Sequence, residues 1–209
     1  PNNPTDTEWV KLQDFVTTLH TDYGIHTVLV HFGGLYADDA GHFYLSIADA
    51  TDKTAVRNDI LEFASQVSQM GSAVTAVQIG NENEYYVYNA SKTYFGGTDI
   101  SNTINLTPED YYSFMNDLAA AYKSVDSSHP VFLGHGNVYD SFLNHDNELT
   151  SQLPWLLAHT SNFDGISLNL YPNLPLASSV RTVEELDRDF GQSIRLISQL
   201  NKPVIISEF

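Results

Sequence analysis

The sequence predicts an α/β fold built on a parallel sheet, because two patterns repeat along the chain. Amphipathic helical stretches alternate with short runs of β-branched residues, and each run ends in a polar loop. The runs are mostly apolar, which is typical of strands covered on both faces. Parallel neighbours need a long connection that is usually a helix, so the alternation indicates parallel strands. Two architectures fit this pattern, an open doubly wound sheet and a (β/α)8 barrel.

The first unit predicts a capped helix followed by a strand. Thr5 and Glu8 have the spacing of a capping box and precede apolar residues at intervals of three and four. These residues predict a helix that ends before Gly24. Residues 27–30 then predict a strand, and His31 follows it.

The second and third units repeat the pattern. Residues 56–67 predict a helix, and residues 74–79 predict a strand that leads into Asn81 and Glu82. A long polar and aromatic loop then extends to about residue 106. Thr107 and Pro108 start the next helix with a cap and a first-turn proline, and the short strand over residues 131–133 leads to His135.

The last two units end in further polar residues. A helix is predicted over residues 153–158, and the strand at residues 165–170 contains Asn169 and leads to Tyr171. The final helix is capped by Thr182, and the last strand leads to Glu208. Five predicted strands therefore each end in at least one side chain capable of chemistry.

Composition limits the function classes. The chain has 209 residues, with 9 Lys and Arg against 26 Asp and Glu, and its formal net charge is −17. This charge argues against nucleic acid and against an anionic membrane surface as partners. No Cys is present, no apolar run approaches the roughly 20 residues of a membrane span, and no cluster resembles a catalytic metal site. We therefore expect a single domain, or part of a larger one, over residues 1–209, with neither metal nor cofactor.

The most informative residues are two acids at predicted strand ends. Active sites of both candidate architectures lie at the C-terminal ends of the strands, and Glu82 and Glu208 occupy such positions three units apart. In a barrel, two such acids can face each other across a substrate. Two carboxyl groups about 5–5.5 Å apart define a retaining glycosidase, and a wider gap admits a water and gives inversion.

The motifs Gly80-Asn81-Glu82 and Ile206-Ser207-Glu208-Phe209 resemble the two signatures of clan A glycoside hydrolases, which are retaining (β/α)8 enzymes. The resemblance implies that Glu82, after the fourth barrel strand, is the acid/base and that Glu208, after the seventh, is the nucleophile. Glu84, two residues further on, is the alternative acid, but it lacks a preceding Asn at the strand terminus. The chain is then similar to strands three to seven of the barrel, and we expect an incomplete barrel that lacks strands one, two and eight.

The resemblance also implies substrate-binding residues. Asn81 would bind the sugar 2-hydroxyl, and Tyr171 would hydrogen-bond the nucleophile. His135 and His31 occupy strand-end positions that often line the sugar site. Family 5 members often carry His where this chain has Asn169, which departs from that family.

The function expected from the resemblance is hydrolysis of a β-linked oligo- or polysaccharide through a covalent glycosyl-enzyme. Two alternatives stay open: a non-catalytic carbohydrate-binding relative, and a different barrel enzyme such as an aldolase or isomerase. The acidic, Cys-free composition is compatible with secretion.

Overall fold

The main sheet consists of consecutive parallel strands. The computed structural model describes residues 6–37, 43–83, 106–136, 148–169 and 182–208. Within these ranges a five-stranded sheet has the order β1-β4-β5-β6-β7, and every neighbouring pair is parallel. The strands are β1 (Thr27–His31), β4 (Val74–Ile79), β5 (Val131–His135), β6 (Gly165–Asn169) and β7 (Val204–Glu208). A doubly wound sheet reverses its strand order at a switch point, whereas this order never reverses, as in a (β/α)8 barrel.

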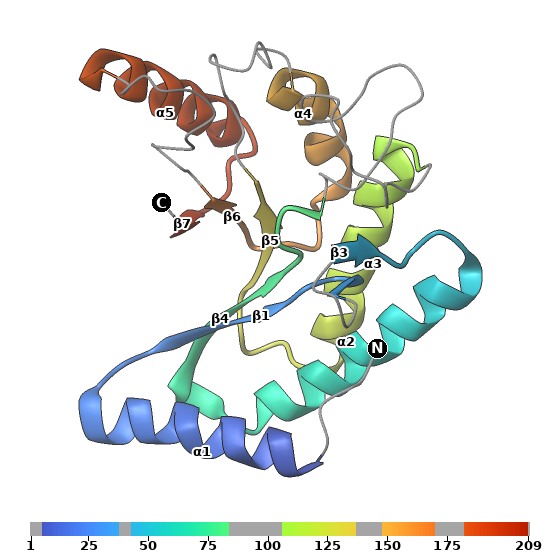
Figure 1. Ribbon diagram of the computed structural model, residues 1–209, viewed down its shortest axis with the longest axis vertical. Helices are drawn as coiled ribbons and strands as arrows, with labels where there is room; N and C mark the ends of the chain where they lie inside the picture. Colours follow the sequence, from blue (N-terminus) through green and yellow to red (C-terminus); the bar gives the residue numbers. More distant parts are fainter. Residues whose placement is uncertain (1–5, 38–42, 84–105, 137–147, 170–181, 209) are drawn as a thin grey trace.

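Helices precede or connect these strands along one side of the sheet. They are α1 (Asp6–Tyr23), α2 (Ala50–Ser68), α3 (Pro108–Val125), α4 (Glu148–His159) and α5 (Val183–Ser198). Figure 1 shows α1 to α4 following one another along an arc outside the strands. The described part of the chain is therefore a segment of a (β/α)8 barrel, which is one of the two architectures that the alternation left open and the one that the resemblance implied. Among the described helices, none has the length and apolar character needed to span a membrane.

Local sequence signals explain where the helices begin. The Thr107 side chain accepts a hydrogen bond from the Asp110 backbone N–H at 3.1 Å, and Pro108 opens α3, as predicted. Asp49 caps α2 in the same way, because its side chain accepts a hydrogen bond from the Asp52 backbone N–H at 2.9 Å. This cap was not predicted from the sequence. Helix α1 begins at Asp6, and the predicted cap Thr5 lies outside the described residues.

The hydrophobic core lies between the sheet and the helices. Successive side chains of a strand point to opposite faces, so alternate residues of each strand face the helical layer. Those buried residues are Val77, Ile79, Val131, Leu133, Ile166 and Leu168 from the strands, and Val56, Ile60, Phe63, Tyr111, Met115, Leu118 and Tyr122 from α2 and α3. This layer determines which strand residues remain to face the barrel interior.

The opposite, concave face of the sheet is buried at its centre and open at the β1 edge. Gln78 and Asn169 are about 1% exposed, whereas Val28 and Val30 of β1 are 43% and 41% exposed. Val28 and Val30 pair with Ala76 and Gln78 of β4, which places them on this face. An apolar residue exposed at the edge of a barrel interior indicates where a further strand would pack.

A small hairpin was not predicted from the sequence. The strands β2 (Leu35–Ala37) and β3 (Phe43–Leu45) pair antiparallel directly after β1. Leu35 and Leu45 are 8% and 3% exposed, so their burial holds the hairpin against the body. Strands of three residues are too short to show periodicity, so the sequence pattern does not predict them. The 3-10 helix η1 (Gly71–Ala73), directly before β4, was also not predicted.

A buried polar network lies at the N-terminal end of the sheet, just before β5. Asp126 accepts from the Tyr122 hydroxyl at 2.7 Å and also contacts the His129 ring, whose Nε2 reaches the Gly71 carbonyl at 2.9 Å. Burial opposes ionisation of Asp126, but hydrogen bonds from Ser128, His129 and Tyr122 outweigh it and lower its pKa to about 2. Burial and the neighbouring Asp126 raise the pKa of Tyr122. The network ties α3 to the segment that starts β4.

Candidate active site

The segment after β4 makes a tight turn that exposes a carboxylate. Gly80 has φ 81° and Glu82 has φ 56°, so the chain enters the left-handed region twice within three residues. Glycine adopts this conformation without cost, whereas a residue with a side chain loses roughly 1–2 kcal/mol. Such strain persists only where the surrounding structure holds the turn, and it is common at functional sites.

Asn83 holds this turn from within. Its side chain is fully buried, and its Oδ1 accepts the Asn81 backbone N–H at 2.8 Å. Its Nδ2 donates to the carbonyls of Phe32 at 2.7 Å and Gly33 at 3.3 Å in the loop after β1. Asn83 therefore joins the loops that follow two neighbouring strands, and the position of Glu82 depends on both.

Gln78 lies at the end of β4 and faces the concave side. Its Nε2 donates to the Gly80 carbonyl at 2.9 Å and to Asn81 Oδ1 at 3.2 Å. The neighbouring strand leaves room for this side chain because it has Gly134 there. A Cβ on Gly134 would stand 2.5 Å from Gln78 Nε2 and would also collide with the Gly80 carbonyl.

Asn169, at the end of β6, contacts two residues of the predicted motif. Its Nδ2 donates to Glu82 Oε1 at 3.1 Å and to Asn81 Oδ1 at 3.2 Å. Its Oδ1 accepts from the Ser207 hydroxyl of β7 at 2.6 Å, and Asn169 itself is 1% exposed. The ends of β4, β6 and β7 are thus connected through one amide group. The structure brings Asn81, Glu82 and Asn169 together as the position of their strands predicted.

The second predicted acid belongs to the same end of the sheet. The β6–β7 pairing aligns Glu208 with Asn169, after a register shift between Leu168 and Asn169. Ser207, which bonds to Asn169, directly precedes Glu208 in the chain. The backbone of Glu208 therefore lies beside the amide that contacts Glu82. Tyr171 and Glu84 lie outside the described residues.

His31 is placed differently from the acids. It faces the helical layer at the end of β1, where its ring centroid lies 5.3 Å from that of Phe63 and its Nδ1 accepts the Gly33 N–H at 3.0 Å. Burial lowers its pKa to about 4, although the charge of Asp59 opposes the shift. The imidazole is thus neutral at pH 7, and contact with a sugar stays a prediction.

His135 also faces the helical layer. It is 2% exposed, its Nε2 lies 2.9 Å from the Tyr112 hydroxyl, and its Nδ1 lies 3.1 Å from the Gly136 carbonyl. The planes of its ring and of the Tyr112 ring on α3 are nearly parallel, with centroids 6.3 Å apart. Its contacts hold the β5 end against α3, and its proposed contact with substrate also stays a prediction. Among the residues described, no three His, Asp or Glu side chains gather as a metal site would require.

Three polar residues that organise the site were not identified from sequence. Asn83, Gln78 and Ser207 each form hydrogen bonds within the strand-end network. Gln78 offered a signal, because its side chain is the largest polar one in the run over residues 74–79. Asn83 and Ser207 adjoin the two predicted acids, but adjacency in sequence does not indicate which way a side chain points.

Comparisons with known proteins give a fold and no sequence family. No protein-family model matches the chain, and no curated protein matches it either. Solved structures do match. A glucosidase from Croceicoccus marinus aligns with a TM-score of 0.59 at 13% identity, over 99% of this chain and 39% of that one.

Two further structures agree with this result. A β-1,4-D-mannanase from Cryptopygus antarcticus aligns with a TM-score of 0.58 at 15% identity, over 99% of this chain and 58% of its own. BuGH86, crystallised in complex with neoagarooctaose, aligns with a TM-score of 0.57 at 13% identity, over 99% of this chain and 36% of its own. The chain thus spans well under two thirds of the length of these structures. Its fold is that of part of a (β/α)8 barrel, as in these structures.

Proposed function

We propose that the chain forms part of a retaining β-glycoside hydrolase of clan A, which cleaves a β-linked oligo- or polysaccharide. Glu82 is the general acid/base and Glu208 the nucleophile. One observation carries the proposal: the Asn169 amide contacts Glu82, in the segment after β4, while the β6–β7 pairing aligns Asn169 with Glu208. Both acids thus belong to the C-terminal end of the sheet, where barrel enzymes have their active sites.

Charge and hydrogen bonding give each acid its role. Glu208 attacks the anomeric carbon while Glu82 protonates the leaving oxygen, and Glu82 then activates the water that hydrolyses the glycosyl-enzyme. Glu82 must hold its proton at working pH, and the like charge of an ionised Glu208 raises the pKa of Glu82 for that purpose. Asn81 contributes a hydrogen bond to the sugar, and the binding partner is therefore a carbohydrate. Secretion of the protein belongs to the same proposal.

The test uses the full chain as it occurs naturally, with β-linked oligosaccharides as substrates. Glu208→Gln and Glu82→Gln should each lower kcat/KM by roughly 10²–10⁴-fold. A 2-deoxy-2-fluoro glycoside should label Glu208, as shown by mass spectrometry of the peptide. Asp117→Asn, on the outer helix α3, is the matched control and should keep full activity.

Two outcomes would contradict the proposal. Hydrolysis with inversion, seen as the α-anomer in the first product, would exclude a covalent intermediate on Glu208. Sugar binding without turnover would indicate a carbohydrate-binding relative. The basic limb of the pH–rate profile should also disappear or move in Glu82→Gln, and an unchanged limb would remove Glu82 from the acid role.

A further inference from the structure

The hydrogen bonds at the strand ends form a series that runs in one direction. The Gly80 carbonyl can only accept, so the Gln78 amide must turn its Nε2 toward it, at 2.9 Å. The same Nε2 lies 3.2 Å from Asn81, which must therefore present its Oδ1. A backbone carbonyl thus fixes the orientation of two side-chain amides in sequence.

The direction is passed on to Asn169. Because Asn81 presents Oδ1, the Asn169 amide must turn its Nδ2 toward it, at 3.2 Å. That NH2 group has a second proton, which it donates to Glu82 Oε1 at 3.1 Å. A donor at this position stabilises the charged form of a carboxylate.

The far end of the series does not fix the direction. The Ser207 hydroxyl lies 2.6 Å from Asn169 Oδ1 and 3.1 Å from the Leu168 carbonyl. A hydroxyl has one proton and two acceptor sites. It can donate to Asn169, or it can donate to Leu168 and accept from a reversed Asn169 amide. Ser207 therefore fits both orientations of Asn169.

We infer that Gln78 is a positioning residue that sets the protonation of Glu82 without contacting it. With Gln78 in place, the Gly80 carbonyl allows only the orientation in which Asn169 donates to Glu82. Without the Gln78 donor, Asn81 can turn its NH2 toward Asn169, and Asn169 then turns its Oδ1 toward Glu82. An acceptor beside Glu82 favours the protonated acid, which donates to it.

The inference rests on the proposed function only in giving Glu82 a catalytic role, because the orientation argument concerns the amides alone. The charged and titratable groups near Glu82 are few among the described strand ends. Glu208 aligns with Asn169 on β7, whereas His31 and His135 face the helical layer from β1 and β5. Neither imidazole lies on the face that holds Asn169.

The experiment measures the Glu82 pKa by carboxyl ¹³C NMR in the full chain, without substrate. Gln78→Met keeps the side-chain volume and removes the donor. The Gln78 Oε1 atom is buried and has no partner in the described part of the chain. Removing this atom therefore leaves no donor without its acceptor. We expect the Glu82 pKa to rise by about one unit, which is a tenfold change in the ratio of protonated to ionised Glu82.

Ser207→Ala is the matched control, because it removes a network hydroxyl and leaves the Gly80–Gln78 anchor intact. It should leave the Glu82 pKa within about 0.3 units, well below the one-unit effect. No rise in Gln78→Met, or an equal rise in Ser207→Ala, would overturn the inference. If Glu82 shifts as expected but no glycoside is hydrolysed, the proposed function fails while the positioning role stands.

A measurement on the unchanged chain covers the case in which Gln78→Met does not fold. The Asn169 side-chain amide protons should show nuclear Overhauser effects to the Glu82 γ-methylene. Effects to the Ser207 β-methylene in their place would show the reverse orientation and overturn the inference.

Discussion

The two ends of the sheet carry buried polar networks of different chemistry. At the N-terminal end, Asp126 is a carboxylate that receives hydrogen bonds from Tyr122, His129 and Ser128. At the C-terminal end, the connecting groups are the uncharged amides of Gln78 and Asn169. The first network satisfies a buried charge and so holds the fold together. The second orients amide donors toward the partly buried carboxylate of Glu82.

The backbone differs between the two ends in the same sense. Asp126 lies in extended backbone at the end of α3, whereas Glu82 has a left-handed φ of 56°. Strain at a non-glycine residue lowers stability and is retained where function needs it. This difference predicts that substitutions at the N-terminal end change stability most, and that those at the C-terminal end change the Glu82 site most.

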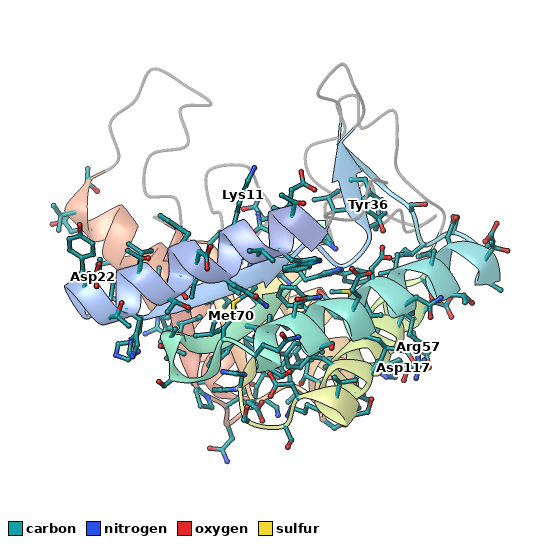
Figure 2. The ribbon with its side chains drawn as sticks, turned by 90° about the horizontal axis from the view of Figure 1, so that it is seen from below. Lys11, Asp22, Tyr36, Arg57, Met70 and Asp117 are labelled. Carbon is teal, nitrogen blue, oxygen red and sulfur yellow. The ribbon has the colours of Figure 1, made fainter. Side chains whose placement is uncertain are left out.

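The largest expected effect is that of Asp126→Ala. Removing the carboxylate leaves the His129 ring and the Tyr122 hydroxyl buried without their partner, which should cost roughly 3–5 kcal/mol of unfolding free energy. Urea denaturation followed by circular dichroism measures it. Asp117→Ala, an exposed carboxylate of the same helix shown in Figure 2, should change the value by less than about 0.5 kcal/mol. Equal effects would show that the network contributes nothing specific.

Gly134→Ala should have the next largest effect, at the other end of the sheet. Its Cβ would collide with the Gly80 carbonyl and stand 2.5 Å from Gln78, so we expect a loss of about 3 kcal/mol. Gly24→Ala is the control, because Gly24 has φ +66° and open space around it. Its cost should be that of the left-handed conformation alone, roughly 1–2 kcal/mol. A smaller loss at Gly134 than at Gly24 would mean that β4 and β5 separate easily.

Asn169→Ala should cost about 1–2 kcal/mol, because it removes hydrogen bonds that water can partly replace at the strand ends. The more informative result is local. Glu82 loses a donor to its charged form, so its pKa should rise, as measured by carboxyl ¹³C NMR. A large stability loss with an unchanged Glu82 pKa would show that Asn169 stabilises the fold and does not control Glu82, which contradicts the contrast between the two networks.

The last prediction concerns the dependence of stability on acidic pH. The pKa of Asp126 is lowered to about 2, so its contribution to stability is complete above the unfolded-state value of about 3.9. That contribution is lost as the pH falls through about 2. Asp126→Asn should therefore flatten the acid limb of the stability curve in that window. If the unfolding free energy of Asp126→Asn falls with acid as it does in the unchanged chain, other carboxylates cause the acid unfolding.

Much of the fold followed from local patterns. The helix starts at Thr107 and Pro108 and the apolar runs around Val77 and Leu133 predicted the order of helices and strands, because capping and periodicity act over a few residues. The hairpin β2–β3 was not predicted, because its strands are three residues long and depend on burial of Leu35 and Leu45.

The sequence by itself determined that Asn81, Glu82, Asn169 and Glu208 would all stand at the ends of parallel strands. Only the tertiary structure decided that Asn169 donates to Glu82 while His31 and His135 turn toward the helices. The reason is that alternation along a strand assigns a residue to one of two faces, but the register between strands and the helical layer decide which face is which. The direction of each amide then depends on partners from three separate strands, beyond the reach of any local pattern.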